Sequence, residues 1–478
     1  MSSVVVEVAN TDTDTDTDER THLLHNSSTS VPSRDSAAGV EEIAPSSSSN
    51  EPDESLRPNS VGSSQRLASL DVFRGLTVAL MILVDDAGGA FPSINHSPWF
   101  GVTLADFVMP FFLFGVGVSI GLVFKKVTNK PSATKKVVLR TIKLFLLGVV
   151  LQGGYFHGRG DLSYGVDVLK LRWLGVLQRI SIGYLFAAVL EIWLVNSIAV
   201  DSALTFVKRY YCPVYEVLSI NSSSSTSIHG SGTQIVHCGM RGNLQPACNA
   251  VGLVDRFVLG IHHLYQHPVY RRTKECSVNS PDYGPLPQNS PDWCLAPFDP
   301  EGILSSLMAA ITCVVGLHFG HIVVHFKGQM QRVFLWSMSS FPLLISGYVL
   351  SVLGIPFSKP LYTLSYMCIT AGASGFLLTI LFYIVDIKHI RKPTMVLQWM
   401  GMNALIIFAL GACELFPAAL QGLYWHSPEN NLVDGTELLL QSMLHSRKWG
   451  TLGFVVLEIL FWGLVAGFLD MKRFYIRL

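Results

Sequence analysis

The chain has 478 residues, of which 49% are hydrophobic and only 14% are charged, and its mean hydropathy is +0.39. This composition excludes an ordinary soluble protein of this size and indicates a protein that crosses a membrane several times. The 34 basic and 34 acidic residues cancel, so the overall charge gives no reason to expect a nucleic acid as partner.

The two kinds of charge lie in different parts of the chain. Residues 1–65 hold 12 acidic and 3 basic residues, a net charge of −9, and the remainder carries +9. The first segment is rich in Ser, Thr, Asp and Glu, and it has too little apolar surface to offset the entropy of ordering a chain. We therefore expect residues 1–65 to form a disordered, acidic, cytosolic tail. Within it, Glu19–Leu24 fits the acidic-dileucine pattern that sorting adaptors read. This segment is either a sorting signal or a stretch without function.

The rest of the chain is dominated by long apolar segments. Roughly 20 apolar residues are needed to cross the hydrocarbon core as a helix, and runs of Leu, Ile, Val and Phe without strict alternation favour helices over a barrel. We predict an all-α, polytopic membrane protein with about nine to ten transmembrane helices. The nine clear segments are approximately 68–87, 104–124, 138–156, 173–197, 303–325, 333–354, 361–385, 394–416 and 449–469.

Basic residues in short loops indicate which ends of the spans face the cytosol. They gather at 125–136, 327–332, 388–392 and 472–477. This pattern places both termini in the cytosol, which requires an even number of crossings, whereas nine is odd. Either a weak tenth segment crosses between 198 and 300, or the chain lacks a helix there.

This topology divides the chain into regions with different expected environments. They are the tail 1–65, the first four transmembrane helices 66–200 with an active-site loop 88–106, a polar loop 201–300 on the lumenal side, and the remaining helices 301–478. The polar loop holds four cysteines without CxxC or CxxH spacing, which favours disulfides in an oxidising lumen over zinc. Their pairing stays open, because four cysteines allow three connectivities.

Ionisable residues in or beside the spans are the candidate functional residues, since such groups are costly in a membrane. Asp71 and Arg74 share one helix face and are either an ion pair or part of a site. His96 has two carboxylates within a few turns, Asp85 and Asp106. An imidazole can act as nucleophile or general base near neutral pH, and a carboxylate can orient it. We interpret these three residues as a catalytic group.

Further polar residues on the spans could bind a phosphate-bearing ligand or merely anchor helices at the interface. Arg140 and Lys143 begin the third span, and Gln178 and Arg179 lie on the fourth with Arg172 before them. Three histidines lie on one helical face at 318, 321 and 325, and a polar stripe explains them better than a metal site does. We expect no bound metal.

Two stretches carry a resemblance to a known family: 66–76 (RLASLDVFRGL) and 95–110 (NHSPWFGVTLADFVMP). They resemble the heparan-α-glucosaminide N-acetyltransferase family in its plant-type branch. The resemblance continues at 164–167 (YGVD), 177–180 (LQRI), the Cys238–Cys294 loop, 316–321 (GLHFGH) and 401–404 (GMNA).

The resemblance implies an enzyme that acetylates across a membrane. Acetyl-CoA would be the co-substrate on the cytosolic side, and an amino sugar or another acceptor would take the acetyl group in the lumen. His96 matches the family's active-site histidine, which either carries the acetyl group or acts as base. The family's nearby Asn corresponds to Asp85 here, and the family has a membrane helix that this chain lacks between its fourth span and the cysteine loop.

Polar positions in the matching motifs, together with the cationic residues Arg140 and Lys143 on the third span, form the candidate ligand set. We predict acetyl-CoA binding by Arg74, Arg140, Lys143, Gln178, Arg179, His318 and Asn403. The expected location is a vacuolar or lysosomal membrane, and membrane lipid is the expected environment. A homo-oligomer is left open. Two alternative functions stay in play: a solute transporter, because of the buried charges, and a catalytically degenerate relative, because of Asp85 and the missing helix.

Overall fold

The computed structural model describes residues 67–125, 129–153, 155–156, 164–165, 171–194, 244–246, 248–265, 267–412, 420–427 and 430–475. The acidic tail with its sorting motif and most of the region expected to hold the tenth crossing lie outside these residues. The statements below concern the described part of the chain.

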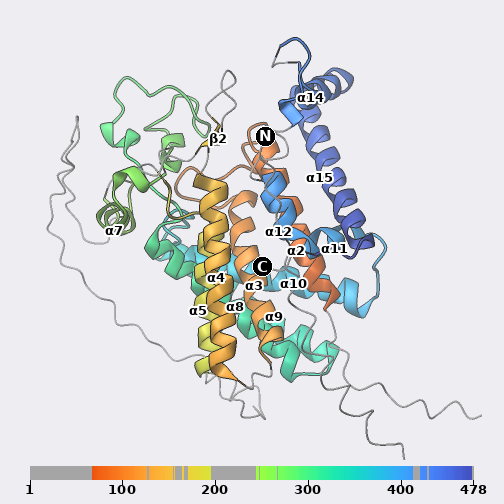
Figure 1. Cartoon of the computed structure of the whole chain (residues 1–478). Coiled ribbons are helices and arrows are strands. Elements are labelled where there is room, and N and C mark those ends of the chain that lie inside the picture. The colour runs from red at the N-terminus through yellow and green to blue at the C-terminus, as the bar shows by residue number, and fades with distance from the viewer. Residues whose placement is uncertain are drawn as a thin grey trace, which may run out of the picture. The chain divides into compact units, whose positions relative to one another are not determined.

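Every one of the nine predicted spans overlaps helical structure (Figure 1). The long helices are α2 (Ala68–Ala87), α3 (Leu104–Val123), α4 (Lys130–Gly153), α5 (Val176–Leu194), α8 (Ile303–His325), α9 (Gln329–Val352), α10 (Leu364–Phe382) and α15 (Arg447–Met471). The eighth predicted span is divided into α11 (Met395–Met402), α12 (Ala404–Ile407) and the π-helical turn η6 (Phe408–Ala412).

Short elements complete the described structure. The π-helical turn η5 (Tyr383–Ile387) extends α10, and α14 (Leu432–Met443) packs on α15. The polar loop contains α7 (Ala250–Leu259) and the turns η2 (Ile261–His263), η3 (Val269–Arg272) and η4 (Asp292–Leu295). Two short antiparallel strands, β1 (Tyr155–Phe156) and β2 (Tyr164–Gly165), lie between α4 and α5.

The predicted all-α membrane fold is confirmed. In the described part, six helices are long and apolar enough to cross a membrane: α3, α5, α8, α9, α10 with η5, and α15. α2 carries Asp71, Arg74 and two further carboxylates, α4 begins with several lysines, and the 395–412 segment is broken at Asn403. The total of nine to ten crossings therefore stays a prediction.

Helix α3 is the central element of the bundle. Its buried side chains belong to three apolar clusters, with Leu113 in one, Phe114 in another and Val108 in the third. By contrast, α9 and α15 present large apolar side chains outward, among them Phe334 and Phe468. Such an outward apolar surface is what contact with lipid requires.

Helices α2 and α11 approach each other very closely. A Cβ atom on Gly75 would lie 1.7 Å from the carbonyl oxygen of Leu397, and one on Gly401 would lie 1.8 Å from that of Asp71. Only glycine allows these backbones to meet, as small residues commonly do between membrane helices. This close contact fixes the position of α2, the first span, relative to α11, the first part of the broken segment.

The alternating directions of the helices create two distinct ends. The end of α2 at Asp85 meets the starts of α3, α5 and α8, whereas the opposite end holds Lys125, Lys327 and Lys388. We call these the His96 end and the basic end. Eighteen residues of helix separate Leu67 from Asp85, which corresponds to about 27 Å, close to the thickness of a hydrocarbon core.

Candidate active site

His96 lies in the loop that joins α2 to α3 at the His96 end. The loop is fixed on both sides: Ala105 N donates to Ile94 O (3.1 Å), and Gly101 N donates to Phe357 O (2.9 Å). Gly101 has a φ of +110°, which a residue with a side chain rarely adopts. The glycine therefore lets the loop turn back and contact the segment between α9 and α10.

His96 is paired with Asp106, as the sequence predicted. Its Nδ1 donates to Oδ1 of Asp106 at 2.9 Å, and the side chain of His96 is 32% exposed while that of Asp106 is fully buried. A neutral histidine has one protonated nitrogen, so this bond assigns the proton to Nδ1 and leaves a lone pair on Nε2. The pair thus presents Nε2 as the reactive atom.

Asp106 is held in place by the start of its own helix. Its Oδ2 accepts from the backbone and hydroxyl of Thr103 (both 3.0 Å) and from the backbone and hydroxyl of Ser97 (3.2 and 2.9 Å). Asp106 is the third residue of α3, and its bond to the backbone of Thr103, the residue before the helix, is part of a capping box. The carboxylate is consequently rigid and can orient the imidazole.

Lys359 is a third charged residue at the site, and the sequence analysis missed it. Its Nζ lies 3.0 Å from Nδ1 and 3.1 Å from Nε2 of His96. Burial lowers the pKa of His96 below its ordinary value, and Lys359 lowers it further, whereas Asp106 acts in the opposite direction. One signal could have found Lys359: it is a basic residue in a short loop on the lumenal side of the predicted topology, where basic residues are disfavoured.

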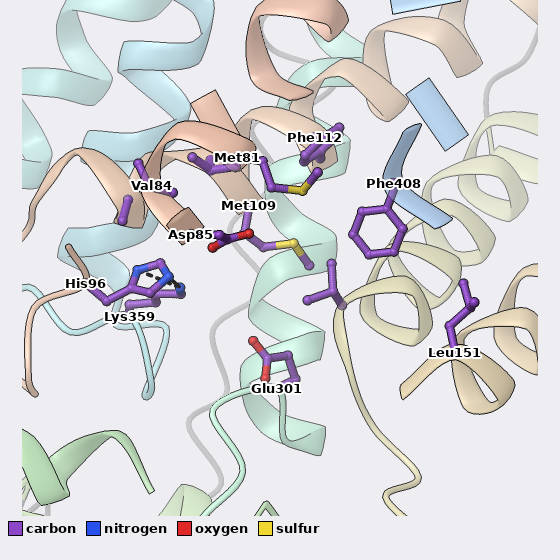
Figure 2. Close-up of a pocket in the computed structure, with 13 residues that line it drawn as sticks. Met81, Val84, Asp85, His96, Met109, Phe112, Leu151, Glu301, Lys359 and Phe408 are labelled. Carbon is purple, nitrogen blue, oxygen red and sulfur yellow. Dashed lines mark hydrogen bonds between the residues drawn. The ribbon is translucent and has the colours of Figure 1, made fainter. Parts of the chain in front are cut away.

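A cavity of about 280 Å³ opens beside His96 (Figure 2). Figure 2 shows His96 and Lys359 in contact on one side of the cavity, with Asp85 nearby and Glu301 across from them. Most of the remaining wall is apolar and comes from several helices: Met81, Val84, Ala105, Val108, Met109, Phe112, Leu151, Val176 and Phe408. The cavity therefore combines an apolar wall with two carboxylates, one ammonium and one imidazole.

Glu301, also missed by the sequence analysis, belongs to an ion network beside the cavity. Arg172 donates to both carboxylate oxygens of Asp299 (2.9 and 2.6 Å) and to Glu301 (2.5 Å). Burial opposes the charged form of Glu301, but Arg172, Arg179 and Lys359 together outweigh it and lower the pKa of this carboxyl. The negative charge of Glu301 is thereby kept in the cavity wall.

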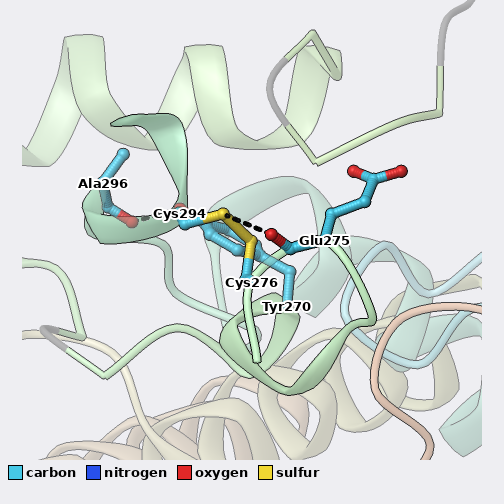
Figure 3. The surroundings of a disulfide bond; sticks show 5 residues. All are labelled: Tyr270, Glu275, Cys276, Cys294 and Ala296. Carbon is cyan, nitrogen blue, oxygen red and sulfur yellow. Dashed lines mark hydrogen bonds between the residues drawn. A yellow bond between two sulfur atoms is a disulfide. The ribbon is translucent and has the colours of Figure 1, made fainter. Parts of the chain in front are cut away.

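The cysteine-containing loop packs directly on the active-site loop. Trp99 donates from Nε1 to Leu244 O (2.9 Å), and its ring lies 5.2 Å from Phe298 and 5.7 Å from Tyr270. Cys276 and Cys294 form a disulfide within the same buried cluster (Figure 3). The prediction of disulfides in this loop is confirmed, and Cys248 is disulfide-bonded as well.

The predicted acetyl-CoA ligands do not form one group. Arg74 pairs with Asp71 (3.4 Å), which confirms the ion pair, and it also donates to Ser119 on α3. Its guanidinium group therefore contacts residues of the helix bundle. Arg140 and Lys143 are exposed on α4, and Arg140 lies over the ring of Tyr184.

Arg179 lies at the His96 end, away from Arg74. It is fully buried and donates to Pro300 O (2.6 Å) and Ser305 Oγ (2.5 Å) at the start of α8. Gln178 and Asn403 are also buried, and their side-chain amide atoms bond to no described residue. These two amides are therefore suited to meeting polar groups of a ligand.

The three histidines of α8 contact different neighbours. Nε2 of His321 lies 2.7 Å from Glu191 on α5, that of His318 lies 3.3 Å from Ser339 on α9, and the ring of His325 stacks on His321. Among the described residues no group of three or more metal-ligating side chains occurs. Two of these histidines thus contact neighbouring helices, and the third lies against one of them.

A second cavity, of about 340 Å³, lies at the basic end. Cationic side chains contribute much of its polar wall, namely Lys125, Arg332 and Arg391, together with His389 and the carboxylate of Asp386. Arg332 also donates to Phe326 O (2.6 Å). The two cavities thus lie at opposite ends of α2 and α3 and differ in charge.

Comparison with known proteins agrees with the resemblance seen in the sequence. A family model described as heparan-alpha-glucosaminide N-acetyltransferase, catalytic, matches residues 66–219. The heparan-alpha-glucosaminide N-acetyltransferase of Mus musculus is 28% identical over 435 residues, which are 84% of this chain and 61% of that protein. The protein of the same name from Homo sapiens is 26% identical over 430 residues, 83% of this chain and 60% of its own length. The chain spans about three fifths of the length of these relatives.

Proposed function

From its resemblance to the heparan-α-glucosaminide N-acetyltransferase family, we propose that this chain is a membrane-embedded acetyltransferase. It moves an acetyl group from acetyl-CoA, supplied from the cytosol, to an amino-sugar acceptor in the lumen of a vacuole or lysosome. The single observation that carries the proposal is the position of His96, which is oriented by Asp106 and lines a cavity at one end of the helix bundle.

The pair of His96 and Asp106 supports two routes for acetyl transfer. In the first, the Nε2 lone pair of His96 bonds to the thioester carbon and the CoA thiolate leaves, after which the amine of the acceptor takes the acetyl group from His96 and loses a proton. In the second, the amine attacks the thioester carbon directly, Nε2 takes the proton of the amine, and the C–S bond breaks so that the CoA thiolate leaves. Both routes need a neutral imidazole with an unprotonated Nε2, which the bond from Nδ1 to Asp106 provides.

The walls of the cavity suit the two substrates in different ways. The apolar wall from α2, α3, α4 and η6 fits the acetyl group and the adjoining thioester end of acetyl-CoA. The carboxylates of Asp85 and Glu301 fit the hydroxyl and amino groups of a sugar, because carboxylates accept hydrogen bonds from both.

The charge difference between the two ends supports the proposed direction. Basic loops favour the cytosolic face, so the basic end faces the cytosol and the His96 end faces the lumen. The cationic side chains around the second cavity would attract the phosphates of CoA on the cytosolic side. We call the cysteine-containing loop that packs on the active-site loop the cap, and its disulfide between Cys276 and Cys294 agrees with an oxidising lumen.

A reconstituted system tests the proposal and separates it from its alternatives. Purified protein in lipid vesicles receives radiolabelled acetyl-CoA outside and glucosamine inside, and labelled N-acetylglucosamine is measured. Transfer by the wild-type chain that is lost in His96→Ala supports the acetyltransferase. Uptake of glucosamine without consumption of acetyl-CoA would instead support a transporter. A folded wild-type chain that neither binds nor consumes acetyl-CoA would support a degenerate relative.

A further inference from the structure

Lys359 comes to His96 from a distant part of the chain. It lies 263 positions along the sequence from His96, in the segment between α9 and α10. This segment is fixed to the active-site loop, because Phe357 O accepts from Gly101 N (2.9 Å). It is also closed on itself, since Thr363 Oγ1 donates to Pro356 O (2.9 Å) and accepts from Ser358 N (3.2 Å). The position of the ammonium next to the imidazole is therefore built into the backbone.

The hydrogen bonds determine what the ammonium can do there. Nδ1 of His96 uses its proton in the bond to Asp106, so the acceptor that remains on the ring is Nε2. Nζ of Lys359 lies almost equally far from the two ring nitrogens, 3.0 Å from Nδ1 and 3.1 Å from Nε2, so its positive charge lies against the imidazole ring as a whole. A second proton on the ring would bring two positive charges into contact.

Charged groups from several elements surround Lys359 and His96. The charged groups that act on Lys359 come from several elements, namely Asp106, Glu301, Asp85 and Arg179. Those that act on His96 are Lys359, Asp106 and Arg272. Asp106 alone would stabilise an imidazolium, and Lys359 is the nearest cation that opposes this.

We propose that Lys359 is a positioning residue that keeps His96 neutral, with the proton on Nδ1 and the lone pair on Nε2. The inference rests on the proposed function, in which Nε2 is the reacting atom. Asp85 and Glu301 line the same cavity and are further carboxylates that the ammonium can contact. Lys359 thus acts on the reaction through His96 and not through the substrate.

The test measures the titration of His96 without relying on catalysis. Diethyl pyrocarbonate modifies neutral imidazole, and mass spectrometry of the peptide that carries His96 gives the modification rate of this one histidine at each pH. In Lys359→Met the lowering influence of the ammonium is gone, so the pKa of His96 rises. A rise of half a unit makes the modification about threefold slower at pH values below both pKa values.

Two control variants accompany the test. Lys359→Arg keeps the positive charge, and its His96 should titrate close to the wild-type pH. Lys327→Met removes an exposed lysine at the basic end and should leave the titration of His96 unchanged. Size-exclusion chromatography of each variant shows whether it is folded. An identical titration of His96 in folded Lys359→Met and wild-type protein would overturn the proposal.

Acetyl transfer supplies a second readout. In Lys359→Met the acid limb of kcat/KM should move to higher pH together with the modification curve. If the wild-type chain transfers no acetyl group, the proposed function fails, but the modification experiment still decides whether Lys359 sets the charge of His96. The two failures are therefore distinguishable.

Discussion

Within the described residues, two histidine–carboxylate pairs with similar N–O distances lie in very different surroundings. His96 and Asp106 are 2.9 Å apart at the end of the bundle, and His321 and Glu191 are 2.7 Å apart between α8 and α5. The side chain of His96 is 32% exposed and lines a cavity, whereas that of His321 is 5% exposed and lines neither cavity described above. A short contact to a carboxylate is therefore no sign of catalysis by itself.

The second difference between the pairs is the neighbouring cation. Lys359 touches His96, while His325 stacks on His321. The first pair thus combines a cavity with a lysine contact, whereas a second imidazole ring lies on the second pair. The second pair joins two helices inside the membrane domain, where each partner satisfies the other.

Removing the two histidines in turn should give the largest contrast. His96→Ala should lower kcat for acetyl transfer by about 1,000-fold, within the range that a general acid–base group supplies. His321→Ala should leave kcat of the folded protein within about threefold and lower thermal stability instead, because it leaves a buried carboxylate without its partner. Activity assays and melting curves on both variants check this. Equal loss of kcat in the two would contradict the distinction.

Changing the carboxylates should give a smaller contrast of the same kind. Asp106→Asn keeps the shape of the side chain but weakens the orientation of His96, so kcat should fall by about 100-fold. Glu191→Gln should change kcat little, since Glu191 contacts His321 and not the cavity. Steady-state kinetics on detergent-purified variants measure both values. A larger loss of kcat in Glu191→Gln than in Asp106→Asn would reverse the assignment.

Only the first pair is covered by the disulfide-bonded cap, which gives the next prediction. Replacing Cys276 and Cys294 by Ala opens a loop of 18 residues and should cost the cap about 3 kcal/mol of unfolding free energy. Because Trp99 packs in the same cluster, kcat should fall several-fold while the contact of His321 with Glu191 is unaffected. Melting curves and kinetics test this, with Cys368→Ala as the control for a free buried cysteine. Unchanged stability and kcat would mean that the cap does not support the active-site loop.

The smallest effect concerns pH. Burial and then Lys359 hold the pKa of His96 below its ordinary value of 6.5. A lowered pKa means that the imidazole stays neutral to lower pH, so activity should persist as the pH falls through 6.5 and be lost only below it. The acid limb of kcat/KM between pH 4.5 and 8 gives the measurement. If kcat/KM instead falls at a pH above 6.5, the pKa of His96 is raised and not lowered, which contradicts the prediction.

Much of the site could be predicted from sequence because its parts are close along the chain. His96 and Asp106 are ten residues apart, and Thr103 and Ser97, which hold Asp106, lie in the same stretch. The histidine and the carboxylate that it contacts are thus visible in one motif. Arg179 was harder to interpret, because its partners at the start of α8 lie more than 120 residues away.

The sequence by itself determined the all-α membrane fold and the nearness of His96 to a carboxylate, since hydropathy and local spacing are properties of neighbouring residues. Only the tertiary structure decided that Lys359 and Glu301 join His96 in one cavity and that Cys276 pairs with Cys294. The physical reason is that helix packing brings together residues from separate spans, and a charge has a function only in relation to the charges packed against it.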